Sequence, residues 1–409
     1  MSYLTDNIRV KWAADSNGDL IDLTCGNSSA ISVELAIQRM QSDPVWQQIA
    51  EGSGENIAEC LIERQRMSDL TLVRGARYQP HPRHETTARL LSIDGYQYVN
   101  TYHKPKWIME DGNIQPFFSL MCRLFPNKTD REQMYSWLAM LAHHPERKSY
   151  GIILKGGQGS GKSTILRIME KLVGVENAFI TSNMKCVSGG FNSIWMDSVL
   201  VGLEEVKSIS NAGSFYNALK TFVSDIRQAG ERKGKDIERF DCFSKVVVCT
   251  NAEVPFPLEE DDRRFAVYSI EHKFDQEETN NFIAMHIDEV VENIGAIAKW
   301  LKTRIPAEWS VNAPASEAKA EVVEQSLPEW QVMLRDYISS KEVVTLEEAS
   351  SVSKAYVQAI KPATVGAFIK KEGWLNRRVR WAGDRTQIYY KPLHENTSTK
   401  DLLKIMQES

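Results

Sequence analysis

The chain has 409 residues, of which 42% are hydrophobic and 25% are charged, so it is long enough for two or three globular domains. Its 49 Lys and Arg residues face 54 Asp and Glu residues, which excludes binding of nucleic acid through an overall basic charge and leaves only local basic patches. The six cysteines include no C-x-x-C pair, and no apolar run approaches the roughly 18 residues of a membrane span. We expect a soluble, cytoplasmic protein with reduced thiols and no membrane partner.

The sequence divides into three regions that differ in pattern. The first shows helical spacing of apolar residues at 32–40 and 56–68 and is expected to be mostly helical, with no indication of its role. The second holds the recognisable motifs and begins with a helical collar that includes Asp130–Ala142. The third opens with a small, polar run, Asn312–Ala320, that is typical of a linker. The predicted boundaries of the three regions are 1–110, 111–310 and 311–409.

A glycine-rich segment lies between the apolar run Tyr150–Leu154 and apolar residues that keep helical spacing up to Val173. Its pattern is G-x-x-x-x-G-K-S between a predicted strand and a predicted helix, which is the context that a phosphate-binding loop requires. Backbone N–H groups of such a loop, together with the helix N-terminus, can bind a polyphosphate. The segment consists of Gly156, Gly157, Gln158, Gly159, Ser160, Gly161, Lys162, Ser163 and Thr164.

Two of these side chains have expected roles in the binding of ATP and Mg²⁺. Lys162 would neutralise charge on the β- and γ-phosphates, and the Ser163 hydroxyl would bind the metal ion. The simpler alternative is a glycine-rich turn that contains Lys and Ser by chance.

Two adjacent glutamates, Glu204 and Glu205, follow a second apolar run, Val199–Leu203. Carboxylates at the carboxyl end of a strand lie at the crevice where nucleotides bind in such sheets. One glutamate, Glu204 in our prediction, can hold hydrated Mg²⁺, and the other can polarise the attacking water. The alternative is a pair of solvated glutamates. In a GTPase, an N-K-x-D motif that recognises guanine follows the phosphate-binding loop. The sequence has no such motif after the glycine-rich segment, which favours ATP over GTP.

A third predicted strand, Lys245–Thr250, ends at Asn251, whose amide could orient the attacking water, although an Asn after a strand is also a common turn former. The pair Arg263 and Arg264 follows on a predicted loop. An arginine there could reach the ATP of a neighbouring subunit as an arginine finger, which in other systems accelerates hydrolysis by about 10³–10⁵. The alternative is a surface loop in which the arginines pair with Asp261 and Asp262.

A basic segment, Arg227–Arg239, lies between the second and third predicted strands. Arg232, Lys233 and Lys235 surround the expected turn, and extended arms flank it. A basic hairpin beside an ATP site can hold the phosphate backbone of DNA and move with the state of the nucleotide. The alternative is an ordinary solvated turn.

The glycine-rich loop, the acidic pair, the basic segment, the strand that ends in Asn and the Arg-Arg-Phe sequence occur in this order within 156–265. This ordered set resembles the superfamily 3 helicases of phages, plasmids and small DNA viruses, above all the phage primase–helicase type, over about Tyr98–Tyr268. The resemblance implies an α/β fold with an AAA+-like P-loop NTPase core. It also implies a hexameric ring that moves along single-stranded DNA, and a ring interface is what allows an arginine finger to act in trans.

The resemblance also assigns roles to single residues. It implies that Asn251 is the first sensor, that Arg263 or Arg264 is the finger, and that Glu204 and Glu205 form the second acidic motif. Many relatives place an Asp in this motif, so the carboxylate that holds the metal ion stays open.

Residues 361–391 contain eight Lys and Arg against two acidic residues. A helix is predicted at Thr364–Lys371, and two alternating runs, Trp374–Trp381 and Thr386–Tyr390, predict a hairpin. Helices followed by a basic two-stranded wing indicate a winged-helix-like module. Such a wing could contact DNA, or it could serve only for packing and ring contacts.

The leading hypothesis is an ATP-dependent DNA helicase that forms a ring and acts on single-stranded or forked DNA in phage or mobile-element replication, with a primase or polymerase in the same or another chain. Residues 1–110 show no evident primase active site, so the chain looks like the helicase part of a longer polypeptide. An ATP-switched origin-binding or loading protein that does not unwind DNA is the first alternative. A small-molecule P-loop kinase is the second, and the basic segment and the arginine pair disfavour it.

Overall fold

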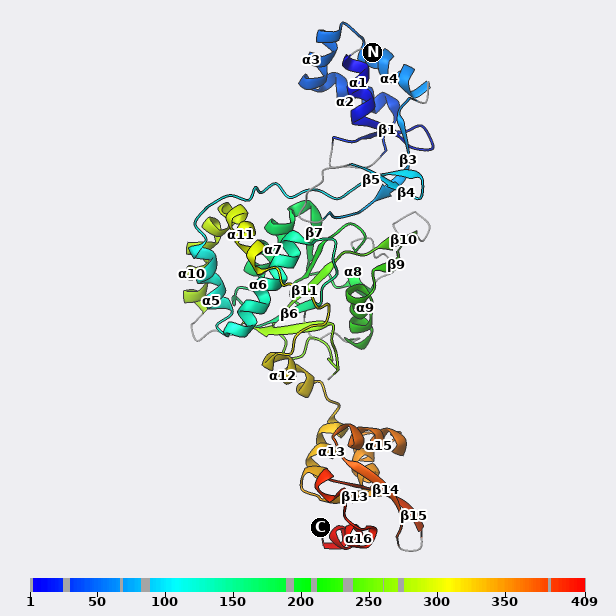
Figure 1. The fold of residues 1–409 in the computed structure, drawn as a ribbon, viewed down its shortest axis with the longest axis vertical. Coiled ribbons are helices and arrows are strands. Elements are labelled where there is room, and N and C mark those ends of the chain that lie inside the picture. Colours follow the sequence, from blue (N-terminus) through cyan, green and yellow to red (C-terminus); the bar gives the residue numbers. More distant parts are fainter. Residues whose placement is uncertain are drawn as a thin grey trace. The chain divides into compact units, whose positions relative to one another are not determined.

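The computed structural model describes residues 3–24, 30–66, 69–81, 89–188, 195–206, 212–230, 238–259, 261–270, 276–381 and 384–408. The chain forms two compact units, Met1–Val322 and Val323–Ser409. The first unit contains an N-terminal α/β region and a larger core built around a central sheet, and the second is a smaller α/β unit (Figure 1).

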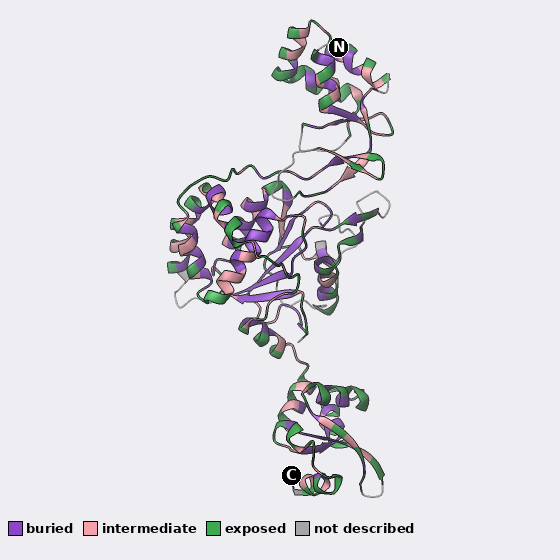
Figure 2. Cartoon of the chain, viewed as in Figure 1, coloured by how far each residue is buried: buried purple, intermediate pink, exposed green. Residues whose placement is uncertain are grey.

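The central sheet has five parallel strands in the order β12-β6-β11-β8-β7. All residues of β6, β8 and β11 are buried, as expected for central strands that are covered on both faces (Figure 2). Because every pair is parallel, the carboxyl ends of all five strands lie at one edge of the sheet. The strands are β6 Gly151–Lys155, β7 Ala178–Thr181, β8 Leu200–Leu203, β11 Lys245–Thr250 and β12 Phe265–Ser269.

Helices cover both faces of this sheet (Figure 1). Alternate strand residues such as Ile152 and Leu154 belong to the largest apolar cluster, which also contains side chains of five helices. These helices are α5 Gln115–Leu124, α6 Lys128–His143, α7 Lys162–Val173, α10 Gln276–Glu292 and α11 Ile294–Leu301. On the opposite side, α9 Ala212–Ser224 contacts the sheet, where the rings of Tyr216 and Phe265 of β12 lie 6.1 Å apart, and α8 Lys185–Ser188 packs against α9. No helix in the described ranges is long and apolar enough to cross a membrane.

The predicted strand, loop and helix around the glycine-rich segment are confirmed as β6, its following loop and α7. The predicted helix Asp130–Ala142 is confirmed as α6, which begins after Asn127 because the Asn127 side chain accepts hydrogen bonds from the N–H groups of Thr129 and Asp130.

The N-terminal region combines four helices with a five-stranded sheet in the order β2-β1-β3-β5-β4. The helices predicted at 32–40 and 56–68 are confirmed as α2 and α4, but a mostly helical region is an incomplete description. β1 and β2 have three residues each, which is too short for an alternating pattern to be visible in the sequence. The helices are α1 Tyr3–Lys11, α2 Val33–Ser42, α3 Pro44–Ser53 and α4 Ile57–Arg66; the strands are β1 Trp12–Ala14, β2 Leu20–Asp22, β3 Thr71–Arg77, β4 Leu90–Ile93 and β5 Tyr96–Asn100.

The segment Asn312–Ala320, expected as a linker, packs against the edge strand β12 instead. The Ala313 N–H donates to the Arg263 carbonyl at 2.7 Å, and the Ser316 hydroxyl donates to the Val267 carbonyl at 2.6 Å. The helix α12 then starts inside the segment, at Glu317–Gln325. Small, polar residues can come close to the open edge of a sheet and form hydrogen bonds with its backbone groups. Composition alone does not distinguish such a segment from a linker.

The second unit packs helices on a three-stranded sheet in the order β13-β15-β14. Its core includes Trp330, Leu334, Val365, Phe368 and Tyr389. The helix predicted at Thr364–Lys371 is confirmed as α15, and the two predicted strands of the hairpin are confirmed as the antiparallel pair β14–β15. Residues 382–383, between these strands, lie outside the described residues. The elements are α13 Glu329–Ser339, β13 Val343–Thr345, α14 Leu346–Lys354, α15 Pro362–Lys371, β14 Leu375–Trp381, β15 Asp384–Tyr390 and α16 Thr399–Glu408.

Candidate functional site

The glycine-rich loop joins β6 to α7 at the carboxyl edge of the central sheet. Gly161 has φ +99°, and a Cβ at this position would also lie 2.5 Å from a methyl group of Leu124. A Cβ on Gly156 would lie 2.5 Å from the carbonyl oxygen of Ile270. The tight course of the loop therefore requires glycine at both positions.

Lys162 is the first residue of α7, and its ammonium group bends back over the loop. It donates hydrogen bonds to the carbonyl oxygens of Gly156 at 2.7 Å and Gly157 at 2.6 Å, and to Ser160 Oγ at 3.2 Å. All three acceptors are uncharged, and burial lowers the pKa of Lys162. A cation held by neutral acceptors at a helix N-terminus creates a site where an anion is favoured.

Ser163 and Glu204 bring two oxygen ligands together beside the loop. The Ser163 hydroxyl donates to Glu204 Oε1 at 2.5 Å. The backbone N–H of Glu204 donates to the Thr181 carbonyl at 2.9 Å, which fixes the glutamate where β7 and β8 end. A hydroxyl and a carboxylate are hard oxygen ligands of the kind that Mg²⁺ binds, so this pair fits a magnesium ion.

Glu205 has φ +54°, in the left-handed region that a glutamate seldom adopts. The next residue returns to the sheet, because the Val206 N–H donates to the Cys249 carbonyl at 3.0 Å. The unusual backbone at Glu205 therefore lets two neighbouring glutamates take different environments. Glu204 contacts Ser163, while the Glu205 side chain is exposed.

Asn251 follows β11, the strand that lies between β6 and β8 in the sheet. Its position is therefore between the loop and the two glutamates. The loop residues 158–164, Glu204, Glu205 and Asn251 line one cleft of about 450 Å³. This volume is within the usual range of small-ligand sites.

The same cleft includes residues that sequence reasoning missed. Ser182 follows β7, and Asn280 belongs to α10. Each is a single polar residue without a surrounding pattern, so no sequence signal singles it out. Cys249 also lines the cleft, but burial and the nearby Glu204 carboxylate raise the pKa of its thiol to about 12. This thiol stays neutral near pH 7 and is no nucleophile.

The predicted basic segment forms an antiparallel pair, β9 Arg227–Gly230 and β10 Glu238–Asp241. Its root is attached to α9, because Gln228 Nε2 donates to the carbonyls of Thr221 at 2.9 Å and Asp225 at 3.0 Å. The predicted DNA-binding residues at its turn, Arg232, Lys233 and Lys235, lie outside the described residues.

Arg263 and Arg264 precede β12, at the amino edge of the sheet. The Gly151 N–H donates to the Arg264 carbonyl at 2.8 Å, so the arginine pair lies beside the start of β6, whereas the loop follows its end. The structure therefore does not bring the arginines together with the cleft of the same chain.

Asp262 fixes the backbone of the arginine pair. Its side chain is fully buried, and Oδ1 accepts hydrogen bonds from the N–H groups of Arg264 at 2.9 Å and Phe265 at 3.0 Å. The Tyr216 hydroxyl donates to the other carboxylate oxygen, and Lys319 Nζ lies 3.6 Å from Oδ1. Burial and the carboxylate raise the pKa of Tyr216. Asp262 is thus a buried anchor, in contrast to the surface ion pair that we weighed as the alternative for this loop.

One face of α9 contacts the segment that contains the arginines. Tyr216, Lys220 and Ser224 are spaced four residues apart, and this spacing places side chains on one side of a helix. Lys220 Nζ lies 3.0 Å from Glu259, and Arg264 Nε donates to Ser224 Oγ at 2.9 Å. The same helix is attached to the root of the β9–β10 pair through Gln228.

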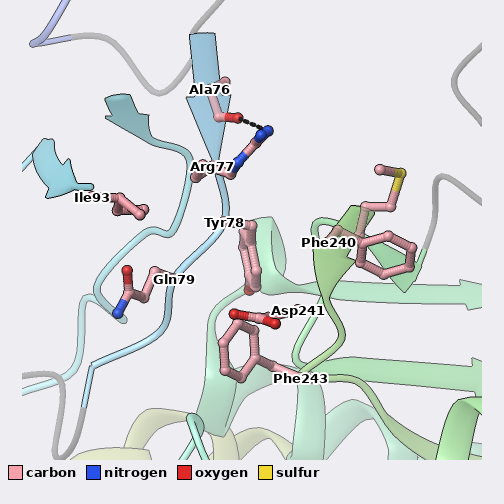
Figure 3. Close-up of a pocket in the computed structure, with 9 residues that line it drawn as sticks. Ala76, Arg77, Tyr78, Gln79, Ile93, Phe240, Asp241 and Phe243 are labelled. Atoms are coloured by element: carbon pink, nitrogen blue, oxygen red, sulfur yellow. Dashed lines mark hydrogen bonds between the residues drawn. The ribbon is translucent and has the colours of Figure 1, made fainter. Parts of the chain in front are cut away.

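A small cavity of about 60 Å³ lies where the end of β3 meets the root of β10 (Figure 3). Arg77, Tyr78, Phe240 and Asp241 are among its lining residues. The Tyr78 hydroxyl donates to Asn177 Oδ1 at 2.9 Å, so this segment is attached to the core. The cavity has room for a few water molecules at most, so it is too small for a ligand the size of a nucleobase. We interpret it as a small gap in the packing between β3 and β10.

Comparison with known proteins relates the chain to phage replication proteins. Residues 154–264 match a family model described as "Family of unknown function (DUF5906)". A DNA primase-polymerase of Nitratiruptor phage NrS-1 is 24% identical over 217 residues, which cover 51% of this chain and 29% of the relative. The chain thus spans less than a third of the relative's length.

Solved structures of the NrS-1 C-terminal region match nearly the whole chain. An apo structure has a TM-score of 0.65 at 18% identity and covers 95% of this chain and 98% of that chain. An A-form apo structure has a TM-score of 0.63 at 16% identity and covers 95% and 99%. The chain is therefore homologous to the NrS-1 primase-polymerase and has the mixed α/β fold, with its parallel sheet, of the C-terminal region of that protein.

Proposed function

We propose that the protein is an ATP-dependent DNA helicase of the superfamily 3 type, which assembles as a ring, expected to be a hexamer, and moves along single-stranded DNA. The main support is the cleft at the carboxyl edge of the sheet, where Lys162, Ser163, Glu204, Glu205 and Asn251 meet. In this proposal the core is a P-loop ATPase, and the second unit is a winged-helix-like module.

Each group in the cleft has a chemical task in this proposal. Lys162 exchanges its three neutral acceptors for phosphate oxygens of ATP. Ser163 and Glu204 hold Mg²⁺, which when bound neutralises charge on the phosphate oxygens. The exposed Glu205 accepts a hydrogen bond from the attacking water, and Asn251 orients that water from the neighbouring strand.

The arginine pair supports a ring. Arg263 and Arg264 lie at the edge of the sheet opposite to the cleft, so they could act only on the nucleotide of another subunit. The Arg263 side chain is exposed and, in the described part of the chain, makes no hydrogen bond or ion pair. Arg264 donates to Ser224 of α9. We therefore assign Arg263 to the neighbouring nucleotide and Arg264 to the contact with α9.

The homology supports a role in DNA replication. The relative is a DNA primase-polymerase of a phage, and this chain corresponds to part of its length. We propose that the protein works with a primase or polymerase in the same or another chain, in the cytoplasm of the host cell. In this proposal Arg232, Lys233 and Lys235 at the turn of the β9–β10 pair contact the DNA backbone.

Two assays on the same preparation test the proposal. ATP hydrolysis should require Mg²⁺ and rise when single-stranded DNA is added, and a forked duplex should be separated only with ATP. Lys162→Ala should abolish both activities, whereas Lys171→Ala, on the same helix, should retain them. DNA binding and ATP hydrolysis without any strand separation at any ATP concentration would contradict the helicase and favour the loading protein.

A further inference from the structure

The second unit contains a two-stranded ribbon that the proposed ATPase does not use. β14 and β15 pair antiparallel along their whole length, from Leu375 opposite Tyr390 to Trp381 opposite Asp384. Residues 375–390 include four arginines and one aspartate, in a chain whose net charge is −5. The ribbon is therefore a local basic feature in an acidic protein.

One face of the ribbon belongs to the core of the unit. Val379 and Ile388 pack in a buried cluster with Leu402 of α16. Arg377 shares this face, and its guanidinium donates to the Thr397 carbonyl at 3.2 Å. This arginine is thus part of the packing of the unit.

The other face is buried at its base, where Tyr389 belongs to the core of the unit, and it presents three exposed arginines farther along the ribbon. Arg378 and Arg380 alternate along β14, and Arg385 lies directly opposite Arg380 on β15. Within the described ranges, none of these three side chains makes a hydrogen bond or an ion pair. Like charges directly opposite each other destabilise an antiparallel pair, so the arrangement carries a cost that a bound anion would remove.

We propose that this face of the ribbon binds the phosphate backbone of duplex DNA. Residues two apart on a strand are separated by about 6.6 Å, so Arg378 and Arg380 can each contact a phosphate of the same DNA strand. Guanidinium groups bind phosphate oxygens in pairs, and a two-stranded ribbon has the width of the major groove. Gln387, opposite Arg378, adds an amide to the same surface.

The aromatic residues of the ribbon favour a duplex over a single strand. Sites for single-stranded nucleic acid combine basic residues with exposed aromatic rings on which bases stack. Here Tyr389 and Tyr390 are buried, and Trp381 packs against the cluster that contains Val379. The arginine face therefore offers charge without a stacking surface. This inference holds whether or not the chain hydrolyses ATP.

The test is the salt dependence of DNA binding by the full chain. Arg378→Gln/Arg380→Gln/Arg385→Gln should weaken the affinity for a short fluorescent duplex at least about tenfold near 0.1 M salt. Because each phosphate contact contributes about 0.9 to the slope of log K against log salt concentration, the slope should become shallower by about 2 to 3. Binding of a single strand of the same length should change little.

A second variant controls for the loss of charge. Lys354→Gln/Lys400→Gln removes two exposed cations elsewhere in the same unit and should leave the duplex affinity and slope nearly unchanged. Thermal melting should show that both variants are folded. Unchanged duplex binding in the ribbon variant would overturn the proposal. The arginines would then serve to keep the edge strand β14 from pairing with other chains. An equal loss for single strands, or in the lysine variant, would overturn it too.

Discussion

At the carboxyl edge of the central sheet, polar side chains surround an open cleft, whereas at the amino edge Asp262 and Lys245 are buried and hydrogen-bonded. The Lys162 and Glu204 side chains contact neighbouring groups of the loop and the cleft, which a ligand can replace. Asp262 is fully enclosed and satisfied by α9, α12 and its own loop. Lys245, at the start of β11, is also buried, and its ammonium donates to the Pro145 carbonyl at 2.9 Å.

The difference shows what each edge can do. A buried charge is tolerated only with several partners, and those partners hold its surroundings in place. The amino edge therefore holds the backbone around Asp262 in a fixed position. The side chain of the next residue, Arg263, is exposed there. The carboxyl edge is built to exchange ligands. In the proposed ring, the two edges are complementary parts of one site, which meet when a second copy is present.

The largest effect should come from the residue that the amino edge presents. Arg263→Ala should lower the rate of ATP hydrolysis by about 10³ and leave ATP binding intact, because the finger stabilises only the transition state. Arg264→Ala should have a smaller effect, since Arg264 donates to Ser224. Hydrolysis rates and binding of a fluorescent ATP analogue measure both. If Arg264→Ala lost more hydrolysis activity than Arg263→Ala, Arg264 would be the finger and Arg263 would not.

A slightly smaller effect should come from the carboxyl edge. Glu205→Gln keeps the size of the side chain and removes the carboxylate that would polarise water, so the turnover number should fall by about 10²-fold while ATP still binds. Glu204→Gln should instead raise the Mg²⁺ concentration needed for half-maximal activity, because Glu204 contacts Ser163. The Mg²⁺ dependence of both variants separates the two roles. An unchanged Mg²⁺ requirement in Glu204→Gln would place the metal elsewhere.

A few-fold effect should follow from loosening the anchor at the amino edge. Tyr216→Phe removes one hydrogen bond to the buried Asp262, a loss of about 1–3 kcal/mol. The turnover number should fall while the KM for ATP stays constant, because the cleft lies at the other edge. Tyr268→Phe, which loses a bond to Gln133 on the opposite face of the sheet, is the control and should change stability only. A rise in KM for Tyr216→Phe would show that the edges are not separate.

The smallest effect concerns stability and pH. Burial and, to a smaller extent, the neighbouring Lys148 lower the pKa of Lys245 to about 7, although Glu146 and Cys242 oppose the shift. The unfolded chain therefore binds more protons between about pH 7 and the ordinary lysine value of 10.5, so the free energy of unfolding rises with pH in this window. One proton contributes at most about 1.4 kcal/mol per pH unit.

Lys245→Met tests this shift. The variant should melt at a higher temperature than the wild type at pH 7, and the difference should shrink as the pH rises to 9. If the difference in melting temperature between the variant and the wild type stayed constant from pH 7 to 9, Lys245 would not titrate in this range.

The sequence predicts the carboxyl edge better than the amino edge. Lys162, Ser163, Glu204 and Asn251 each follow or begin an element with a clear apolar pattern, so their meeting at one edge follows from parallel strands. The anchor at Asp262 depends on side chains that are distant in the sequence and lack a motif, namely Tyr216 and Lys319. The N-terminal sheet is missed because its strands are short and pair with distant partners.

The distance between Arg263 and the cleft leads to the most direct test, which is a mixture of two inactive variants. Lys162→Ala lacks a working cleft but keeps the arginines, and Arg263→Ala/Arg264→Ala keeps the cleft but lacks the arginines. Each alone should be unable to hydrolyse ATP. When they are mixed, subunits with an intact cleft meet neighbours with intact arginines, so DNA-stimulated hydrolysis should return to a substantial fraction of the wild-type rate. No recovery, with mixed assemblies confirmed by a tag on one variant, would contradict a site shared between subunits.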